Sequence, residues 1–372
     1  MKVLLTAASL DLSDGGPSEN IPKLADALSR LGTKVGVVSA FDGSFHSIFD
    51  KGEVKLFVPP VGLGRLGRYP KFVSGVVRDF GADIIHDNGI WLPQNHVVCG
   101  AAIKANKKLL IGVRGMLEPW PLRYKATKKK IAWSLFQKRN LMRAHKLIAT
   151  ADEERRNILG LLPGADVAIV PNGWDVPDNI ADFFEDKSES RPRKVLFFSR
   201  IHPQKGIELL IEAWDTLGPK AWHLDLVGPG DNAYVYSLKR KADDLGLTAN
   251  VRILPPVYGN KEKNEVLGAA DVVVLPSYSE NFGSVVVEAM GLGVPVITTT
   301  GTPWSEIAES KAGWWVAPSV EGIRQALTEA IGLSDAERQA MGRRGREIVM
   351  AKYTWESVAK RMLEVYEQTL AA

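Results

Sequence analysis

The sequence contains a single cysteine among its 372 residues, and all of its apolar runs are short. With only Cys99, the chain has no internal disulfide and no site built from several cysteines, which suits a reducing compartment. A membrane-spanning helix needs about 20 consecutive apolar residues, far more than any run present here. The first residues lead straight into a predicted strand and lack the longer apolar segment of a secretory signal. We therefore expect a cytoplasmic protein.

The sequence patterns of several common active sites are also missing. There is no G-x-S-x-G or H-E-x-x-H motif, and no group of histidine, cysteine and carboxylate residues has the spacing of a metal site. Gly62, Gly64 and Gly67 match the G-x-G-x-x-G pattern of dinucleotide-binding proteins. However, Pro59 and Pro60 separate them from the preceding predicted strand, so a loop is the better interpretation. We therefore expect neither a metal nor a cofactor.

Positive charge is concentrated in the first half of the chain, although the whole sequence carries a net charge of only +4. Residues 1–180 contain 25 Lys and Arg against 17 Asp and Glu, a net charge of +8. The remaining residues contain 22 against 26, a net charge of −4. This asymmetry predicts an acidic partner for the first half, such as a nucleic acid, an anionic membrane or a phosphorylated substrate.

Predicted strands and helices alternate through two successive parts of the chain. The length suggests two domains, and the strand–helix pattern that begins at Lys2–Ala7 starts again at Lys194–Ser199. We predict two doubly wound α/β domains, residues 1–178 and 194–354, joined by a polar linker at 179–193. Ligands of such sheets bind at the carboxyl ends of the strands, so two facing domains would share a cleft.

The stretch from Ser277 to Met290 is typical of a ligand site. It follows the apolar run Asp271–Leu275, which reads as a buried strand, and it leads into a short predicted helix that begins at Ser284. Free backbone N–H groups at the start of that helix favour an anion. Glu280 and Glu288 would flank the anion and accept hydrogen bonds from sugar or ribose hydroxyls. The alternative is two unrelated surface glutamates.

Another candidate loop follows the first strand of each predicted domain. Arg200 and Lys205 lie in the second of these loops, where they could clamp a diphosphate as fixed cations. Gly15 and Gly16 lie in the first, where their N–H groups could contact a phosphate or a sugar. A plain glycine turn is the alternative for the first loop.

His86 and Asn88 lie at the carboxyl end of the predicted strand Asp83–His86 and so would face the proposed cleft. They are candidate contacts for a sugar or an acceptor. A structural, hydrogen-bonded histidine is the alternative for His86.

A basic helix is predicted over about residues 123–145. Residues 114–146 contain ten Lys and Arg with one acid, Glu118, and aromatic and aliphatic residues lie between the charges. This composition favours a helix that binds an anionic membrane surface through residues 123–146. The alternative is a partly buried helix with a solvated basic face. We expect no nucleic-acid partner because no recognised module is visible.

Several of these segments resemble, in the same order, a known enzyme family. Glu280-Asn281-Phe282-Gly283-Ser284-Val285-Val286-Val287-Glu288 resembles the E-x7-E motif of the retaining glycosyltransferases of family four, which have the GT-B fold. The resemblance covers nearly the whole chain through Ser13–Pro17, Val170–Gly173, Ser199–Gly206, Leu226–Gly230 and Asp271–Ser277. It implies two Rossmann-like domains that face a central cleft, with the last helix, within residues 355–372, crossing back onto the first domain.

The resemblance also implies a role for each matching residue. Arg200 and Lys205 would neutralise the leaving nucleotide diphosphate without a metal. Glu280 would hold hydroxyls of the donor sugar, and Glu288 would bind the ribose. Further donor contacts would come from Gly15, Gly16, Gly228, Asn281, Phe282, Gly283 and Ser284. Catalysis with retention would then rest on positioning and on leaving-group electrostatics, with no enzyme nucleophile.

Arg114 departs from the family pattern. Many members place a histidine after the fifth strand, where this chain has Val113-Arg114-Gly115-Met116. Arg114 would take part of that histidine's role or meet an acidic acceptor. The segment Arg114–Trp120 resembles bacterial enzymes that build lipopolysaccharide or exopolysaccharide.

The activity implied by the resemblance is a hexosyl transfer. A glucose- or mannose-type sugar would move from a UDP- or GDP-linked donor to a glycan or lipid-linked acceptor, on the inner face of the cell membrane. A sugar-nucleotide epimerase on the same fold and a non-catalytic glycan-binding relative are the alternatives.

Overall fold

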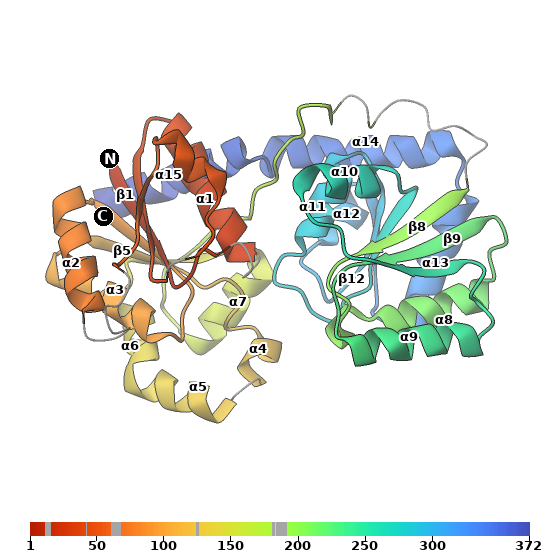
Figure 1. Cartoon of the computed structure of the whole chain (residues 1–372), viewed down its shortest axis with the longest axis horizontal. Helices are drawn as coiled ribbons and strands as arrows, with labels where there is room; N and C mark the ends of the chain where they lie inside the picture. The colour runs from red at the N-terminus through yellow and green to blue at the C-terminus, as the bar shows by residue number, and fades with distance from the viewer. Residues whose placement is uncertain (12–15, 42, 61–67, 124–125, 181–182, 184–191) are drawn as a thin grey trace. The chain divides into compact units, whose positions relative to one another are not determined.

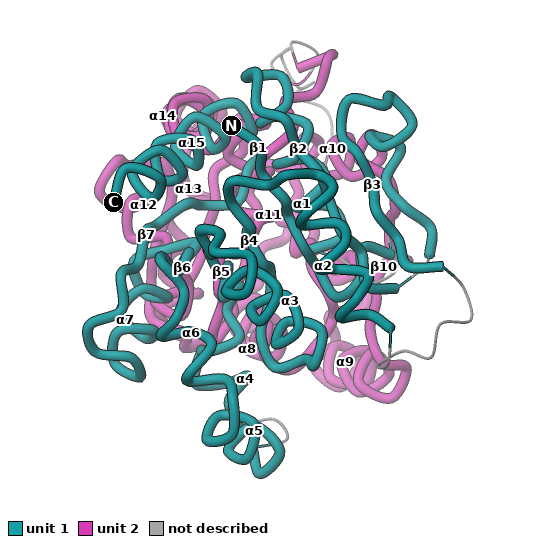
Figure 2. Tube along the Cα trace, turned by 90° about the vertical axis from the view of Figure 1, so that its left-hand side faces the viewer, with its two compact units in different colours: residues 1–173, 355–372 teal, residues 174–354 magenta. Residues whose placement is uncertain are grey.

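A computed structural model describes the chain except at residues 12–15, 42, 61–67, 124–125, 181–182 and 184–191. By its internal contacts the chain divides into two compact units, residues 1–173 with 355–372 and residues 174–354 (Figure 2). Each unit contains one parallel sheet with helices on both faces (Figure 1). The predicted architecture of two doubly wound α/β domains is therefore confirmed.

The sheet of the first unit has seven strands in the order β3-β2-β1-β4-β5-β6-β7. The strands are β1 (Lys2–Ala7), β2 (Lys34–Ser39), β3 (Lys55–Phe57), β4 (Ile84–Asn88), β5 (Lys108–Gly112), β6 (Lys146–Ala149) and β7 (Val167–Ile169). The central strand β4 is buried along its whole length, as expected for a parallel strand with helices on both faces. The strand order reverses between β1 and β4, which is where sheets of this type bind ligands.

Helices cover both faces of this first sheet. They are α1 (Gly16–Arg30), α2 (Tyr69–Phe80), α3 (Pro93–Lys104), α4 (Pro119–Arg123), α5 (Ala126–Ala132), α6 (Lys138–Arg143), α7 (Asp152–Leu161) and α15 (Trp355–Ala371). On one face, α1 and the C-terminal helix α15 lie side by side and share a core with β1 and β4 (Figure 1). On the other face, α2, α3 and α7 share a second core with the same sheet. The last helix of the chain thus belongs to the first unit.

The structure describes the predicted basic helix at 123–145 except at residues 124–125, and it is not a regular α-helix. A π-helical turn, Trp133–Gln137, separates α5 from α6. The wider turn brings the Gln137 side chain into the interior, where its Oε1 accepts the Trp91 backbone N–H at 3.3 Å. A residue inserted in this way is not visible in the 3.6-residue periodicity from which the helix was predicted.

The sheet of the second unit has six strands in the order β10-β9-β8-β11-β12-β13. They are β8 (Arg193–Phe198), β9 (Trp222–Val227), β10 (Val251–Leu254), β11 (Val272–Leu275), β12 (Val296–Thr299) and β13 (Gly313–Val316). The order reverses between β8 and β11. All four residues of β11 are buried apolar side chains, which explains why the sequence shows an unbroken apolar run there.

Seven helices complete the described part of the second unit, namely α8 (Ile207–Leu217), α9 (Asn232–Asp244), α10 (Asn260–Gly268), α11 (Ser284–Gly291), α12 (Ser305–Glu309), α13 (Val320–Gly332) and α14 (Asp335–Lys352). Figure 1 shows α8, α9 and α13 on one face of the sheet and α10, α11 and α14 on the other. Helix α14 begins with a capping box, in which the Ser334 and Glu337 side chains exchange hydrogen bonds with each other's backbone N–H. Of the helices that the structure describes, none combines the length and the apolar character required to cross a bilayer.

Candidate functional site

The second unit brings the E-x7-E residues to the carboxyl end of β11. The loop after β11 ends at Gly283, whose left-handed φ of 75° ends the extended chain and starts α11 at Ser284. The N-cap residue is Gly283, which has no side chain to cap this helix start, so the first N–H groups of α11 can bind a ligand. Two backbone bonds anchor the loop, from the Tyr278 N–H to the Gln204 carbonyl at 2.9 Å and from the Glu280 N–H to the Gly301 carbonyl at 2.8 Å.

Glu280 is paired with Lys205, one of the two predicted clamp cations. The Lys205 ammonium donates to Glu280 Oε1, which also accepts the Ser277 hydroxyl at 2.8 Å. Lys205 comes from the short 3₁₀ turn Pro203–Lys205 after β8, and its exposed fraction is only 9%. An ammonium has three N–H donors, so Lys205 can hold Glu280 and still donate to an anion. Lys205, the predicted phosphate contact, and Glu280, the predicted sugar contact, are therefore joined in one ion pair.

Arg200, the other predicted clamp cation, is exposed just after β8. It forms no ion pair with any residue that the structure describes. The neighbouring loop after β9 packs tightly on this segment, since a Cβ on Gly228 would lie 1.8 Å from the Ser199 carbonyl oxygen. Only glycine permits this approach. Gly228 thus shapes the backbone next to Arg200.

Glu288 is paired with Lys263, a residue that the sequence analysis did not select. Lys263 lies on α10, and its ammonium donates to Glu288 Oε1 at 2.9 Å. Both side chains retain some exposure to solvent. One of the two carboxylate oxygens is thus held by a cation while the other is available to a hydroxyl. The sequence contains no spacing signal for this contact, because 25 residues and a strand separate the partners.

Asn281 and Phe282 lie in the loop before α11, and the Phe282 side chain belongs to the core. It is 5% exposed and packs against Trp304 and Tyr353, with ring centroids 5.2 and 6.1 Å away. The Trp304 indole donates to the Phe282 carbonyl at 2.5 Å. This leaves the backbone N–H as the group of Phe282 that could contact a donor.

In the first unit, His86 is enclosed and does not face an open surface. Its exposed fraction is 0%, and its Nδ1 lies 2.8 Å from the Tyr366 hydroxyl of α15. Burial, and then the charge of Arg114, lower the pKa of His86 to about 3. The structural alternative considered for this histidine is thus the better description, because a neutral, buried imidazole joins β4 to the C-terminal helix.

Asn88 and Arg114 meet at the carboxyl ends of β4 and β5. Arg114 donates to Asn88 Oδ1 from Nε at 3.1 Å and from Nη2 at 2.7 Å, and to Asn172 Oδ1 from Nη1 at 2.9 Å. The backbone of Arg114 has a left-handed φ of 56°, an uncommon conformation for a residue other than glycine. Asn172 was not among the predicted site residues, although the sequence analysis noted its segment. The predicted Gly15 lies outside the described residues, and Gly16 is the first residue of α1.

Asp87, between His86 and Asn88, points to the opposite face of β4. It accepts the Thr6 hydroxyl at 2.6 Å and the Asn95 amide at 3.0 Å. Burial raises the pKa of Asp87 to about 7, although these hydrogen bonds oppose the change. The sequence does not reveal such a group, because its pKa depends on the packing around it.

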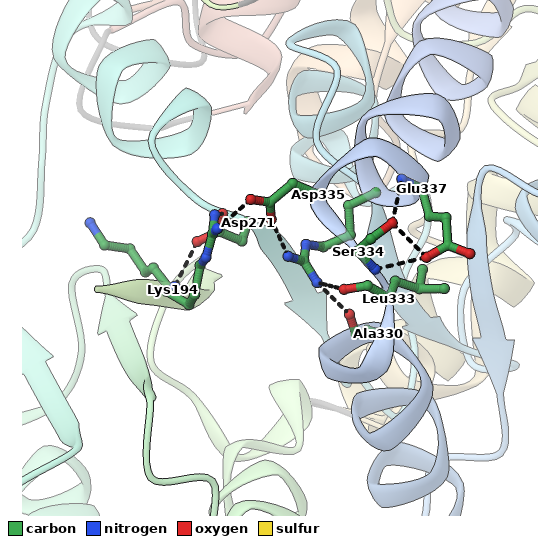
Figure 3. Close-up of polar contacts among 9 residues, drawn as sticks. Lys194, Asp271, Ala330, Leu333, Ser334, Asp335 and Glu337 are labelled. Carbon is green, nitrogen blue, oxygen red and sulfur yellow. Dashed lines mark hydrogen bonds and ion pairs between the residues drawn. The ribbon is translucent and has the colours of Figure 1, made fainter. Parts of the chain in front are cut away.

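A second charged cluster lies at the amino ends of β8 and β11, on the edge of the sheet opposite Glu280 (Figure 3). Arg193 forms ion pairs with Asp271 and Asp335. Arg338 also pairs with Asp335, and it donates to the backbone carbonyls of Ala330 and Leu333 at the end of α13. Burial alone would raise the pKa of Asp335, but the hydrogen bonds from Arg338 and Arg193 outweigh it and lower the pKa. The cluster borders a cavity of 490 Å³. Because the charged side chains of this cluster pair with one another, we infer that the cluster joins α14 to the sheet.

Within the part of the chain that the structure describes, no group of three or more His, Cys, Asp or Glu side chains is placed to hold a metal ion. The polar groups near α11 are two ion pairs, an exposed arginine and open backbone N–H groups. This set can bind an anion and sugar hydroxyls at the same edge of the sheet.

Both halves of the chain match glycosyltransferase family models. Residues 15–173 match the "Glycosyl transferase 4-like domain" and residues 178–348 match "Glycosyl transferases group 1". Among curated proteins, the D-inositol 3-phosphate glycosyltransferase of Mycobacterium tuberculosis is 28% identical over 252 residues, which is 61% of this chain and 49% of that protein. The chain thus spans about half the length of the curated relatives that it matches.

Solved structures share the fold over the whole chain. HepE from Anabaena, solved in complex with UDP, has a TM-score of 0.78 and 22% identity and covers 99% of this chain and 100% of its own. WaaG, described as a glycosyltransferase involved in lipopolysaccharide biosynthesis, has a TM-score of 0.69 and 18% identity and covers 98% of this chain and 99% of its own. At these identities the comparison establishes a common fold.

Proposed function

The chain belongs to the family-four type of glycosyltransferases with the GT-B fold, and from this premise we propose that it transfers a hexose with retention of configuration. The donor would be a nucleotide diphosphate sugar of the glucose or mannose type. The acceptor would be a glycan or a lipid-linked sugar in the synthesis of a bacterial surface polysaccharide. The observation that carries this proposal is the Lys205–Glu280 pair beside the start of α11, together with the Lys263–Glu288 pair on the same helix.

The proposed chemistry depends on charge stabilisation at the leaving group. Lys205 and Arg200 would donate to the diphosphate as negative charge develops on it, and the open N–H groups of α11 would add to this stabilisation. Glu280, held by Lys205, would accept hydroxyls of the donor sugar. An oxygen of the departing diphosphate would then take the proton from the acceptor hydroxyl, on the face that the leaving group vacates. No enzyme nucleophile and no metal are needed for this step.

UDP is the first nucleotide to test. HepE, which shares this fold, has been solved with UDP and with UDP-glucose. Glu288 would bind the ribose, which is common to all ribonucleotides, so this residue does not select the base. We therefore propose UDP-glucose as the first donor for assays, with a GDP-linked sugar as the second.

We also propose that the acceptor side works at a membrane surface. The basic segment, residues 119–143, exposes apolar side chains, with exposed fractions of 56% for Ile131 and 73% for Leu135. Exposed cations lie among them, namely Arg123, Lys128, Lys130, Lys138, Arg139 and Arg143. Figure 2 shows α4 and α5 projecting from the body of the first unit. Each cation near an anionic surface contributes about 1 kcal/mol of attraction.

The proposed function is tested by turnover of UDP-glucose in matched variants. Lys205→Ala should lower kcat by about 10²- to 10³-fold, because it removes a charged donor from the leaving group. Glu280→Gln should also lower kcat, since it weakens both the sugar contact and the hold on Lys205. Lys241→Ala serves as the control, because it breaks a comparable ion pair, with Glu212, on the surface of α9.

The readout is UDP release measured in EDTA, together with the anomeric configuration of the first product by NMR. Full activity of Lys205→Ala, or inversion at the anomeric carbon, would refute the proposed mechanism.

A further inference from the structure

Arg114 has donors left over after its contacts inside the protein. A guanidinium carries five N–H groups, and the contacts with Asn88 and Asn172 use three of them. One N–H on each terminal nitrogen therefore remains. Arg114 forms no ion pair with any residue in the described ranges, and its side chain is only partly buried. The remaining N–H groups form a fork of the kind that binds a carboxylate or a phosphate.

The nearest candidate counter-charge is already in use. Glu154 on α7 accepts the Gly115 N–H at 2.5 Å, the Thr150 N–H at 2.7 Å and the Thr150 hydroxyl at 2.8 Å. Both oxygens are thus occupied by other donors, and Glu154 acts on the guanidinium through its charge alone, which only partly offsets the burial that lowers the pKa of Arg114. The direct partners of Arg114 are two neutral amides. A partly buried cation with neutral partners is under-compensated, and a bound anion would compensate it.

A second polar atom converges on the same place. His86 Nε2 is buried and has no hydrogen-bond partner among the described residues. Gly112, the last residue of β5, packs closely against this group of side chains: a Cβ there would lie 3.1 Å from Asn88 Oδ1, 3.3 Å from His86 Nε2 and 3.4 Å from Arg114 Nε. His86 and Asn88 are buried, whereas Arg114 keeps some exposure, so Arg114 is the member of the group that an anion can reach.

The location agrees with a substrate contact. Asn88 ends β4, Arg114 follows β5 and Asn172 follows β7, so all three lie at the carboxyl edge of the first sheet. Asn88 is also the register partner of Ala7, the last residue of β1. This is the point at which the strand order reverses, where α/β sheets bind their ligands.

We propose that Arg114 binds an anionic group, a carboxylate or a phosphate, on a sugar substrate of this enzyme, and that Asn88 and Asn172 position it. The proposal rests on the proposed function in one respect, namely that the ligand is a sugar. The anionic group would belong to the acceptor, which makes the acceptor a phosphorylated or uronic acid sugar. A uronic acid on the donor is the other source of the same chemistry.

The test measures binding of matched probes without nucleotide and at constant ionic strength. Glucose 6-phosphate is compared with glucose, and methyl α-glucuronide with methyl α-glucoside, by calorimetry and by thermal shift. Wild-type protein should bind the charged member of each pair more tightly. Arg114→Gln should lose this preference by about tenfold or more, as expected for a hydrogen-bonded charge pair, and Arg114→Lys should retain part of it. Arg361→Gln, an exposed arginine of α15 in the same unit, is the control.

Asn172→Asp covers the case in which Arg114→Gln does not fold. Asn172 is only partly buried and accepts from Arg114 Nη1, so this variant places a carboxylate in contact with the guanidinium, and the internal acid should compete with the probe. Equal binding of the charged probes by Asn172→Asp and wild type would overturn the proposal. So would equal binding of charged and neutral probes by wild type.

A separate arm identifies the source of the charge. UDP-glucuronate and UDP-glucose are allowed to compete for wild type and for Arg114→Gln. If wild type prefers UDP-glucuronate and Arg114→Gln does not, the anionic group belongs to the donor. Failure of UDP to bind at all would count against the proposed function and would leave the probe result for Arg114 unaffected.

Discussion

At the scale of single residues, both carboxylates of the candidate donor site are held by lysines from other elements. Lys205 follows β8 and holds Glu280, and Lys263 on α10 holds Glu288. Each pair keeps one oxygen fixed in the ligand-free protein. A carboxylate that is already oriented loses less conformational freedom when a hydroxyl binds to it. Lys263 is therefore expected to affect nucleotide affinity although it need not touch the nucleotide.

Substitution of Lys263 tests this positioning role. Glu288→Ala should weaken UDP binding by about tenfold or more, because it removes a hydrogen bond to a charged acceptor. Lys263→Ala should weaken it by only about two- to fivefold, the effect expected of a partly exposed ion pair. The double variant should be no weaker than Glu288→Ala alone. Calorimetric titration with UDP measures all three, and additive losses in the double variant would contradict the coupling.

The raised pKa of Asp87 predicts that the stability of the first unit depends on pH. Its pKa of about 7 in the folded protein lies above the usual value of 3.8 for an aspartate, so folded Asp87 keeps a proton that the unfolded chain has released. Between pH 4 and pH 7 the folded state therefore binds more protons, and the free energy of unfolding falls as the pH rises. Above pH 7 this contribution is constant.

Comparison with Asp87→Asn isolates the effect, because asparagine does not titrate. The difference in unfolding free energy between wild type and Asp87→Asn should be larger at pH 5 than at pH 8, by on the order of 2 kcal/mol. Burial, with help from nearby acids, also raises the pKa of Glu118 to about 7, but Glu118 is present in both proteins and cancels. Urea unfolding at the two pH values provides the measurement, and a difference that does not change with pH would show that Asp87 remains ionised.

At the scale of elements, the basic segment makes the clearest prediction. Lys128→Gln with Lys130→Gln should weaken binding to anionic phosphatidylglycerol vesicles by roughly 30-fold at low salt, since two surface charges are lost. Binding should also fall with added salt. Lys239→Gln with Arg240→Gln removes the same charge from the exposed face of α9 and serves as the control. Vesicle sedimentation gives the affinities, and equal binding to neutral phosphatidylcholine would argue against a membrane role.

Elements with local signals could be predicted from the sequence. The strand before Pro276, the glycine before α11 and the capping box of α14 each depend on a few neighbouring residues. The π-helical turn at Trp133–Gln137 could not be predicted, because it accompanies a contact of Gln137 with the backbone N–H of Trp91, which lies far away in the sequence.

Contacts between elements could not be predicted from the sequence either. Lys263 meets Glu288, and Asn172 meets Arg114, through the packing of helices and strands. His86 was selected correctly as a residue at a strand end, but burial under Tyr366 gives it a structural environment.

At the scale of the whole molecule, each unit presents a different set of groups at the edge where its strand order reverses. The second unit presents carboxylates, cations and an open helix start, which fit a nucleotide sugar. The first unit presents Arg114 with its amide partners, and it carries the basic segment. The basic segment contributes to the charge asymmetry of the sequence, in which residues 1–180 carry +8 and the remainder −4. The division of these groups between the units explains why substitutions in the two units should affect donor and acceptor separately.

Nucleotide recognition by the second unit is the central claim, and thermal stabilisation by UDP, GDP and ADP tests it most directly. The three are compared in parallel in EDTA, at concentrations up to about 100 times the expected dissociation constant, where a ligand adds about 2.7 kcal/mol to the stability of the folded state. We predict a clear increase in Tm with UDP, little change with ADP, and loss of the UDP effect in Glu288→Ala. The absence of any increase with all three nucleotides, in protein shown to be folded, would contradict the account.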